Sequence, residues 1–382
     1  MKLAICIITY NRPDSLNRVL SSIHQADYAE DEVDLFISID YSGSDSVEKA
    51  ADKYEWAHGK KHVIAHRENL GLRKHILSCG EFVYDYDGLI VLEDDVYVAP
   101  SFYIYAKLCV DKYHDDESVA GISLYSFHLN YHNKLPFEPL VSNSDVYLMQ
   151  NAQSWGQVWM PKQWKAFKNW YKDNSGDFEE MPHLPKSICS WKRSWLKYHT
   201  RYCIEQNKFF IYPYIAQSTC FSDVGDHTSA NSSFIQVQLA SREKKSFILN
   251  PSVIYDAFFE NCRLAETLGI PSEDLCVDIY GDKNNRTNCR YWLTREIHDY
   301  KILKSFGLQM RPMEMNVIRS IAGNEIFLYD THHTEPFSNY GDTRYRQLNY
   351  LEYLYDSNFG LSKALIIFKE SIQRYLRNRL FK

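Results

Sequence analysis

In the N-terminal third of the chain, short unbroken runs of apolar residues alternate with longer segments whose apolar residues recur every three or four positions. The unbroken runs lie at residues 3–9, 33–39, 62–65 and 88–92. One periodic segment begins at Pro13 and carries Leu16, Val19 and Ile23. Unbroken apolar runs are typical of strands buried on both faces, and periodic segments of helices. Their alternation predicts an α/β fold with a mostly parallel, doubly wound sheet.

The alternation continues less regularly further along. Further strands are predicted at residues 118–124, 146–149 and 209–212, and further helices at 101–113, 187–206 and from Pro161 onwards. From about residue 241 the pattern weakens, with strand-like runs at 277–281 and 325–330. We therefore expect a large domain over residues 1–240, a smaller mixed α/β domain over 241–360, and a distinct terminal segment over 361–382.

The terminal segment 361–382 carries six Lys or Arg residues and one acid, whereas the whole chain has a net charge of −6. Its apolar residues recur at helical spacing: Leu361, Leu365, Phe368, Ile372, Leu376 and Leu380. A basic amphipathic helix of this kind can lie on an anionic membrane surface or pack against its own domain. Both interpretations fit the pattern equally.

The composition, 45% hydrophobic and 24% charged over 382 residues, is that of a soluble globular protein. The negative net charge argues against a dedicated nucleic-acid-binding protein. Nine scattered cysteines without a CxxC pair argue against a disulfide framework or a zinc site. No apolar stretch is long enough for a signal peptide or a membrane-spanning helix. We expect a cytoplasmic protein, which on the membrane interpretation of the terminal segment would contact the inner face of the plasma membrane.

Three consecutive acids, Glu93, Asp94 and Asp95, follow the apolar run at 88–92. The C-terminal end of a parallel strand is where open α/β sheets bind ligands. Adjacent carboxylates repel one another unless a cation lies among them. A divalent metal ion facing a phosphate-bearing substrate is one interpretation. A solvated acidic turn is the other.

The turn after the first apolar run, residues 10–14, has the sequence Tyr-Asn-Arg-Pro-Asp. It contains no GxGxxG motif, which argues against an NAD-type Rossmann enzyme. It also lacks the Gly-rich basic loop that would hold a nucleoside triphosphate.

Five motifs occur in order. They are Thr9-Tyr10-Asn11-Arg12-Pro13, Asp40 at a strand end, Arg67-Glu68-Asn69-Leu70-Gly71-Leu72, Glu93-Asp94-Asp95 followed by Val98-Ala99-Pro100-Ser101-Phe102, and Trp155-Gly156. The ordered set resembles the GT-A class of nucleotide-sugar glycosyltransferases, in detail the family-2-type bacterial enzymes and the animal N-acetylglucosaminyltransferase I group. It lies within the first 240 residues, and the region beyond them carries no comparable motif.

The resemblance implies that nucleotide-sugar-binding residues come from each motif. The base and ribose would be bound by Thr9, Arg12, Asp40 and Asp94, with Glu93 in support. The diphosphate would be bound by Arg67, Arg73 and Lys74. The donor sugar and the acceptor would contact Trp155 and Gly156. Exposed helix positions are the alternative interpretation of the three diphosphate candidates, and core packing is that of Trp155.

The resemblance also implies a metal ion, Mn²⁺ or Mg²⁺, bound by Asp95 and by His227 in the sequence Gly-Asp-His-Thr. Such a cation neutralises the leaving nucleoside diphosphate. A polar loop histidine is the alternative for His227. An inverting transfer also needs a base for the acceptor hydroxyl. Because the aromatic stretch at residues 190–195 lacks the acid that some relatives carry, we take Asp177, and then Glu179, as substitutes.

The sequence therefore predicts a metal-dependent glycosyltransferase of the hexosyl type. It would move a sugar from a nucleoside diphosphate, with UDP expected, to a hydroxyl of a glycan or lipid-linked glycan acceptor in polysaccharide or lipid-linked glycan biosynthesis. One alternative is a nucleotidyltransferase that makes a nucleotide sugar. Another is a non-catalytic glycan-binding or scaffold protein, which loss of the acids would favour, although Glu93-Asp94-Asp95 is intact.

Overall fold

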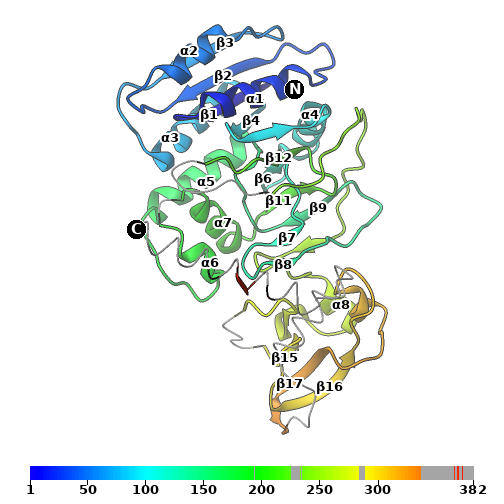
Figure 1. Ribbon diagram of the computed structural model, residues 1–382. Helices are drawn as coiled ribbons and strands as arrows, with labels where there is room; N and C mark the ends of the chain where they lie inside the picture. Colours follow the sequence, from blue (N-terminus) through cyan, green and yellow to red (C-terminus); the bar gives the residue numbers. More distant parts are fainter. Residues whose placement is uncertain are drawn as a thin grey trace.

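The computed structural model describes residues 1–192, 194–224, 233, 235–283 and 289–336, together with Leu365, Phe368, Lys369 and Ile372. Its main feature is a nine-stranded sheet in the order β13-β9-β11-β6-β10-β4-β1-β2-β3 (Figure 1). The strands are β1 (Leu3–Thr9), β2 (Asp34–Ile39), β3 (Lys61–Ala65), β4 (Gly88–Glu93), β6 (Val119–Ser123), β9 (Val146–Met149), β10 (Gln157–Trp159), β11 (Phe209–Pro213) and β13 (Ile254–Tyr255).

The run β4-β1-β2-β3 is parallel throughout. Strand β10 runs antiparallel to both β4 and β6, and β9 runs antiparallel to β11. Every residue of β1 is buried, as expected for a central strand covered on both faces. The predicted α/β class with a mostly parallel sheet is confirmed.

Helices cover both faces of this sheet. They are α1 (Pro13–His24), α2 (Ser46–Lys53), α3 (Leu72–Cys79) with the 3₁₀ turn η1 (Gly80–Asp85), α4 (Phe102–Tyr113), α5 (Pro161–Asn174), α6 (Lys186–Cys189) and α7 (Leu196–Glu205). On one face Ile5 of β1 belongs to a core that includes Leu16 of α1 and Phe102 of α4. On the other, Cys6 belongs to a core with Ile76 of α3 and Trp164 of α5. The alternation of side chains along β1 therefore divides the helices into two layers.

The continuous helix expected at residues 187–206 is instead two helices, α6 and α7. Between them Ser194 Oγ accepts a hydrogen bond of 3.1 Å from the backbone N–H of Leu196. Serine side chains that bond to a nearby backbone N–H favour helix starts over helix interiors. A new helix therefore begins here, although the apolar spacing continues across the break.

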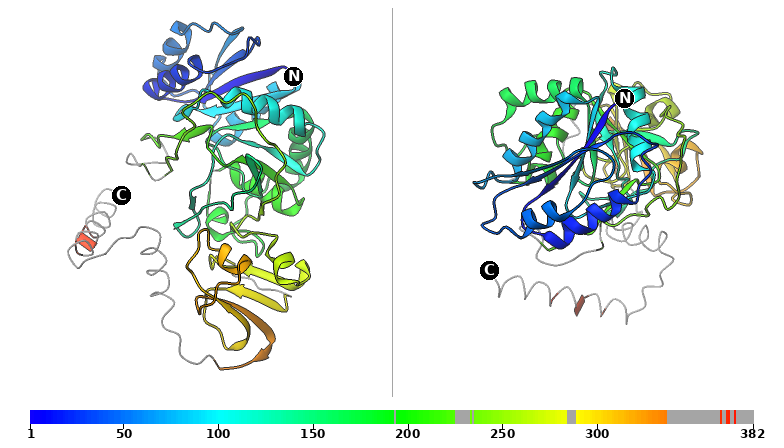
Figure 2. Two further views of the ribbon diagram at one scale, coloured as in Figure 1. Left: turned by 90° about the vertical axis from the view of Figure 1, so that its right-hand side faces the viewer. Right: turned by 90° about the horizontal axis from the view of Figure 1, so that it is seen from above.

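A second, four-stranded sheet has the order β14-β15-β17-β16. Its elements and their neighbours are α8 (Leu264–Leu268), η2 (Ser272–Asp274), β14 (Leu275–Asp278), β15 (Tyr291–Thr294), β16 (Tyr300–Phe306), α9 (Met315–Ile318) and β17 (Ile326–Thr334). This small sheet lies at the end of the molecule away from β1–β3 (Figures 1 and 2). The large sheet takes its last strand from Ile254–Tyr255. The domain limits at residues 240 and 360 stay a prediction.

Two short antiparallel pairs complete the set of strands: β5 (Val96–Val98) with β12 (Ser218–Cys220), and β7 (Leu129–Asn130) with β8 (Leu135–Pro136). Within the described part of the chain, no helix has the length and apolar character needed to cross a bilayer. Of the segment 361–382 the structure describes four residues, all helical and exposed. The remainder of the predicted tail helix lies outside the described residues.

Candidate active site

The carboxyl ends of three adjacent parallel strands bring the first site residues together. Thr9 ends β1, Asp40 follows β2, and Glu93 ends β4, where it lies beside Ile8 in the register of the two strands. A cavity of about 1680 Å³ opens at this edge. Nine of the predicted site residues line it: Thr9, Arg12, Asp40, Arg73, Lys74, Glu93, Asp94, Asp95 and Trp155. Open α/β sheets bind their ligands at the carboxyl ends of the strands, and the cavity lies at that edge.

Asp94 and Asp95 form the turn between β4 and β5. Their exposed fractions are only 2% and 8%. The turn is held from the other side because β5 pairs with β12, and the backbone N–H of Phe221 donates to the Asp95 carbonyl at 2.9 Å. The acids are therefore buried in a fixed turn, and the alternative of a solvated acidic turn is wrong.

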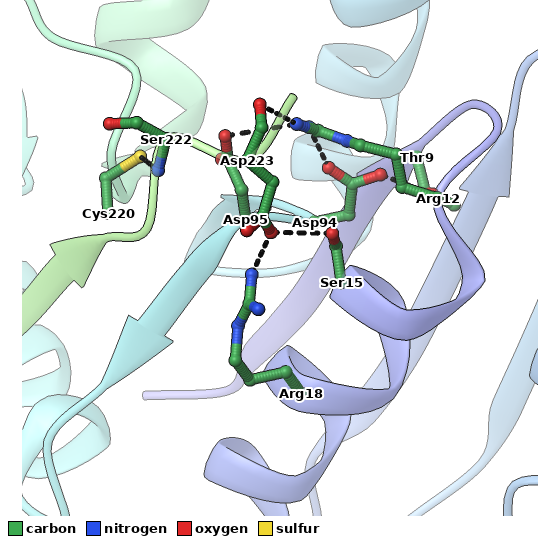
Figure 3. Close-up of polar contacts among 9 residues, drawn as sticks. All are labelled: Thr9, Arg12, Ser15, Arg18, Asp94, Asp95, Cys220, Ser222 and Asp223. Carbon is green, nitrogen blue, oxygen red and sulfur yellow. Dashed lines mark hydrogen bonds and ion pairs between the residues drawn. The ribbon is translucent and has the colours of Figure 1, made fainter. Parts of the chain in front are cut away.

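Arg12 supplies a cation among these acids (Figure 3). Its guanidinium contacts Asp94 and lies 3.3 Å from Asp95 Oδ2. Thr9 Oγ1 donates to Asp94 Oδ2 at 2.7 Å. Burial raises the pKa of Asp94, although Arg12 and Thr9 oppose the shift. Burial and the neighbouring carboxylates Asp95 and Asp94 raise the pKa of Glu93 to about 8.

A further acid, Asp223, holds the start of helix α1 against this cluster. Its carboxylate accepts a hydrogen bond of 2.6 Å from Ser15 and pairs with Arg18 (Figure 3). Its backbone carbonyl accepts from Arg12 at 3.2 Å. Burial opposes ionisation of Asp223, but the bonds from Ser15 and Arg18 lower its pKa overall. Sequence analysis missed Asp223, because no local pattern links it to a helix more than 200 residues earlier.

A divalent metal ion fits this site in part. Asp95 Oδ1 is buried and has no hydrogen-bond partner among the described residues, so one carboxylate oxygen is free for a ligand. The described residues contain no group of three His, Cys, Asp or Glu side chains placed to hold a metal ion. Mg²⁺-type sites use one or two carboxylates plus substrate phosphates and water, which is compatible with a single free oxygen. The predicted second ligand, His227, lies outside the described residues.

Asp40 has a positioning role. Its carboxylate accepts backbone N–H bonds from Tyr41, Leu70 and Gly71 at 2.9, 2.8 and 3.0 Å. These bonds tie the end of β2 to the loop before α3. The backbone at Gly71 in this loop has a φ of 73°, a conformation that favours glycine. Asp40 still borders the cavity. It shapes the loop from which the next candidates project.

The three predicted diphosphate residues are separated. Arg67 is absent from the cavity lining, has a side chain that is 81% exposed, and pairs with Glu48. Arg73 and Lys74 line the cavity from α3. Arg73 lies over the ring of Tyr198 at 4.7 Å and donates to the Lys192 carbonyl at 3.3 Å.

Trp155 and Gly156 occupy different environments. Trp155 is partly buried, lines the cavity and packs on Tyr125 with ring centroids 4.6 Å apart. Gly156 has φ of 104°, and a Cβ there would lie 3.0 Å from Ser218 Oγ and 3.2 Å from Leu124. Gly156 is therefore required by the backbone, and it is absent from the described cavity lining.

The two predicted bases also lie outside the described lining. Asp177 accepts hydrogen bonds from the Tyr198 hydroxyl at 2.8 Å and from Arg73 at 3.3 Å. These two partners lower its pKa, and a lower pKa makes a carboxylate a weaker base. Glu179 is exposed. The geometry assigns no base.

Sequence analysis also missed the lysines of the cavity. Lys165, Lys168 and Lys172 of α5 line it, as does Lys192. Their helical spacing is visible in the sequence, but it is equally typical of a solvent-facing helix surface. Which side of the sheet α5 covers depends on topology, which the spacing does not contain.

The site can now be compared with known proteins. A family model described as the SPBC1E8.03c C-terminal domain matches residues 14–173, less than half of the chain. No curated protein matches the sequence. Among solved structures the chain is similar to S. aureus TarS 1–349 in complex with UDP-GlcNAc, with a TM-score of 0.41, 15% identity, and coverage of 59% of this chain and 60% of that one.

Two further solved structures have lower scores. One is the mannosyltransferase PcManGT from Pyrobaculum calidifontis in complex with GDP-Man and Mn²⁺, with a TM-score of 0.34, 11% identity, and coverage of 56% and 57%. The other is GalNAc-T7 with UDP, GalNAc and Mn²⁺, with a TM-score of 0.38, 11% identity, and coverage of 56% and 42%. Similarity at this level does not transfer a ligand or an activity, and the chain spans only about 60% of the TarS fragment.

Proposed function

We propose that this chain is a metal-dependent glycosyltransferase that transfers a sugar from a nucleoside-diphosphate donor, with UDP expected, to a hydroxyl of a glycan acceptor. One observation carries the proposal. The buried Asp94–Asp95 turn and the Thr9–Arg12 loop meet at the carboxyl edge of a parallel sheet, in a cavity of about 1680 Å³, and among the described residues one Asp95 oxygen has no hydrogen-bond partner. That volume exceeds the usual range for small-molecule pockets, and it leaves room for both donor and acceptor.

On the donor side, Asp94 and the Thr9–Arg12 loop bind the nucleoside, and Asp95 holds Mn²⁺ or Mg²⁺, with His227 as the proposed second ligand. The metal ion, when bound, neutralises charge on the leaving diphosphate. Arg12 already contacts both acids, so it is placed to bind a phosphate oxygen once a metal ion takes over Asp95. A guanidinium suits such oxygens because it presents several N–H donors in a fixed plane.

On the acceptor side, the partly buried Trp155 offers a flat apolar face for a sugar ring at the cavity wall. Asp177, with Glu179 as the second candidate, remains our proposed base, and the inverting outcome rests on the resemblance. We place the reaction in polysaccharide or lipid-linked glycan biosynthesis in the cytoplasm. The basic segment 361–382 would then contact anionic lipid at the inner face of the plasma membrane.

A thermal-shift panel tests the proposal. Nucleoside diphosphates, nucleoside triphosphates and nucleotide sugars, each with and without Mn²⁺, are added to the parent, to Asp95→Asn and to the control Asp52→Asn on the exposed surface of α2. A ligand at 100 times its dissociation constant stabilises the folded state by about 2.7 kcal/mol. We expect this Mn²⁺-dependent stabilisation in the parent and the control, and its loss in Asp95→Asn.

The alternatives give different outcomes in the same panel. If no nucleotide stabilises the parent, the enzyme proposal is wrong. Stronger stabilisation by a nucleoside triphosphate than by its diphosphate would favour the nucleotidyltransferase. Binding without release of nucleoside diphosphate from any nucleotide sugar, measured by chromatography, would favour the non-catalytic protein.

A further inference from the structure

The cavity extends beyond the acids along a wall built by α3, η1 and α5. These elements are in direct contact, because Gly80 lies so close to Trp164 that a Cβ there would be 2.0 Å from the indole ring. Six cations project from this wall and its neighbouring loop into the cavity lining: Arg73, Lys74, Lys165, Lys168, Lys172 and Lys192. The part of the cavity away from Asp94 and Asp95 is therefore strongly basic.

Few acids balance these charges. Glu81 lies in the lining and pairs with Lys168 at 2.7 Å, and Arg73 pairs with Asp177 at 3.3 Å. Within the described part of the chain, no ion pair involves Lys74, Lys165, Lys172 or Lys192. Four uncompensated lysines in one concavity repel one another, in a protein whose net charge is −6. A local field of this sign attracts an anionic ligand.

The spacing of the lysines indicates an extended ligand. Lys165, Lys168 and Lys172 follow the i, i+3, i+7 pattern of one face of α5, which adjoins the buried Trp164. With a rise of about 1.5 Å per residue, this row extends for about 10 Å. In the proposed function, the donor diphosphate is bound by Arg12 and by the metal ion at Asp95. The row therefore has more cations than one nucleotide requires.

We infer that the acceptor is a phosphate-bearing glycan chain, whose successive phosphate groups lie along the lysine wall while its terminal hydroxyl reaches the donor. The inference rests on the proposed function, because it assigns the second substrate of the same cavity. Lysine ammonium groups bind phosphate as compact point charges, whereas the planar fork of arginine suits carboxylate and phosphate alike. The wall has five lysines and one arginine, and that arginine is engaged by Asp177.

Fluorescence anisotropy with labelled inorganic polyphosphate tests the wall directly. Saturating UDP and Mn²⁺ occupy the donor end, and unlabelled polygalacturonate and neutral dextran compete with the probe. The variant is the double charge reversal Lys165→Glu/Lys172→Glu. Its matched control is Lys53→Glu/Lys112→Glu, which changes the net charge equally at exposed positions outside the cavity lining.

We expect the parent and the control to bind polyphosphate equally, and the Lys165→Glu/Lys172→Glu variant to bind at least tenfold more weakly. By analogy with single-stranded nucleic acids, each lost phosphate contact lowers the log–log salt slope by about 0.7. Dextran should not compete, and polygalacturonate should compete weakly. The inference is overturned if the parent fails to bind, if both double variants lose affinity equally, or if polygalacturonate competes better than unlabelled polyphosphate.

The nucleotide thermal shift separates this inference from the proposed function. If UDP with Mn²⁺ stabilises both double variants but polyphosphate does not bind the parent, the acceptor assignment is wrong and the transferase proposal stands. If polyphosphate binds through Lys165 and Lys172 but no nucleotide stabilises the parent, the transferase proposal is wrong and the wall remains an anion-binding site. Retained nucleotide stabilisation in Lys165→Glu/Lys172→Glu also shows that this variant is folded.

Discussion

The guanidinium of Arg12 lies 3.3 Å from Asp95 Oδ2, although the two residues are 83 positions apart. The same guanidinium contacts Asp94, whose side chain is 3% exposed. Arg12 therefore balances part of the negative charge of the acidic turn. The metal ion that we propose at Asp95 would have to share the Asp95 carboxylate with this guanidinium.

Arg12→Gln removes this neutralising charge. Breaking a buried ion pair from one side usually costs 3–5 kcal/mol, and the 23% exposure of the Arg12 side chain favours the lower end, about 3 kcal/mol. We expect that loss in urea unfolding without metal. Mn²⁺ should then restore more stability to Arg12→Gln than it adds to the parent, because no guanidinium competes for Asp95.

Arg12→Lys serves as the charge-preserving control for this experiment. It should retain part of the stability, because an ammonium compensates charge but cannot reach both acids with a planar fork. An equal Mn²⁺ effect on the parent and on Arg12→Gln would show that Arg12 and the metal ion do not share the carboxylates.

The sequence predicted the first half of the large sheet well because its strands are unbroken apolar runs. Strand β1 was expected at residues 3–9 and is Leu3–Thr9, and the run at 146–149 is β9. The apolar spacing predicted one helix over residues 187–206, but the structure has two, and Ser194 accepts a hydrogen bond where the second one starts. Periodicity indicates which side of an element is buried, but a serine that accepts a hydrogen bond from the backbone N–H two residues on can start a new helix without changing that periodicity.

The acidic turn was visible in the sequence because its residues are consecutive at a strand end. The partners that complete it were not, since Asp223 meets Ser15 and Arg18 across more than 200 residues. The lysines of α5 were visible as a row, but their place in the cavity lining depends on how α5 packs, which includes the close approach of Gly80 in η1 to Trp164. Residues that act together through tertiary contacts leave no common signal in one sequence.

Gly80→Ala should disrupt the contact between η1 and α5. The added Cβ would lie about 2 Å from the Trp164 ring. That ring cannot withdraw easily, because it is 1% exposed and stacks on Trp159 with centroids 4.1 Å apart. Overpacking of this kind costs about 3 kcal/mol or more. We expect a clear fall in Tm by calorimetry.

The matched control for this substitution is Gly176→Ala, where a Cβ meets nothing within 4 Å. Its effect should stay within about 0.5 kcal/mol, as is usual for surface changes. If Gly80→Ala and Gly176→Ala have the same Tm, Gly80 of η1 is not in close contact with Trp164 of α5.

His199 is buried in the helical layer, where its ring stacks on Phe167 at 4.2 Å. Neither ring nitrogen has a hydrogen-bond partner among the described residues. Burial lowers the pKa of His199 to about 3. The unfolded chain therefore binds a proton below about pH 6.5 that the folded protein does not, and stability falls as the pH drops from there.

His199→Phe should remove this acid sensitivity. At pH 8 the variant should match or exceed the parent in stability, because no unpaired nitrogen remains buried. At about pH 4.5 it should be more stable by roughly 2–3 kcal/mol, since two pH units correspond to about 2.7 kcal/mol. Urea unfolding at the two pH values measures the difference, with the exposed His114→Phe as control. Parallel pH profiles for the parent and His199→Phe would contradict the burial of this ring.

Asp278, at the end of β14 in the four-stranded sheet, gives the opposite pH dependence. It is 2% exposed, and burial raises its pKa to about 7, although the backbone N–H of Lys283 donates to it at 3.0 Å and the lysine charge opposes the shift. Glu296 and Asp282 add to the shift. The folded protein holds a proton that the unfolded chain releases near pH 4, so the contribution of Asp278 to stability is highest below that pH and falls until about pH 7.

Asp278→Asn keeps the oxygen that accepts the Lys283 N–H and removes the titration. The variant and the parent should be similar in stability at pH 4, whereas at pH 8 the variant should be more stable by up to about 4 kcal/mol, the equivalent of a three-unit pKa shift. Denaturant unfolding followed by tryptophan fluorescence reports on this sheet through Trp292, which is 2% exposed. The exposed Glu273→Gln is the control. If Asp278→Asn loses stability with rising pH as steeply as the parent does, Asp278 is already ionised in the folded protein, and the falling stability has another source.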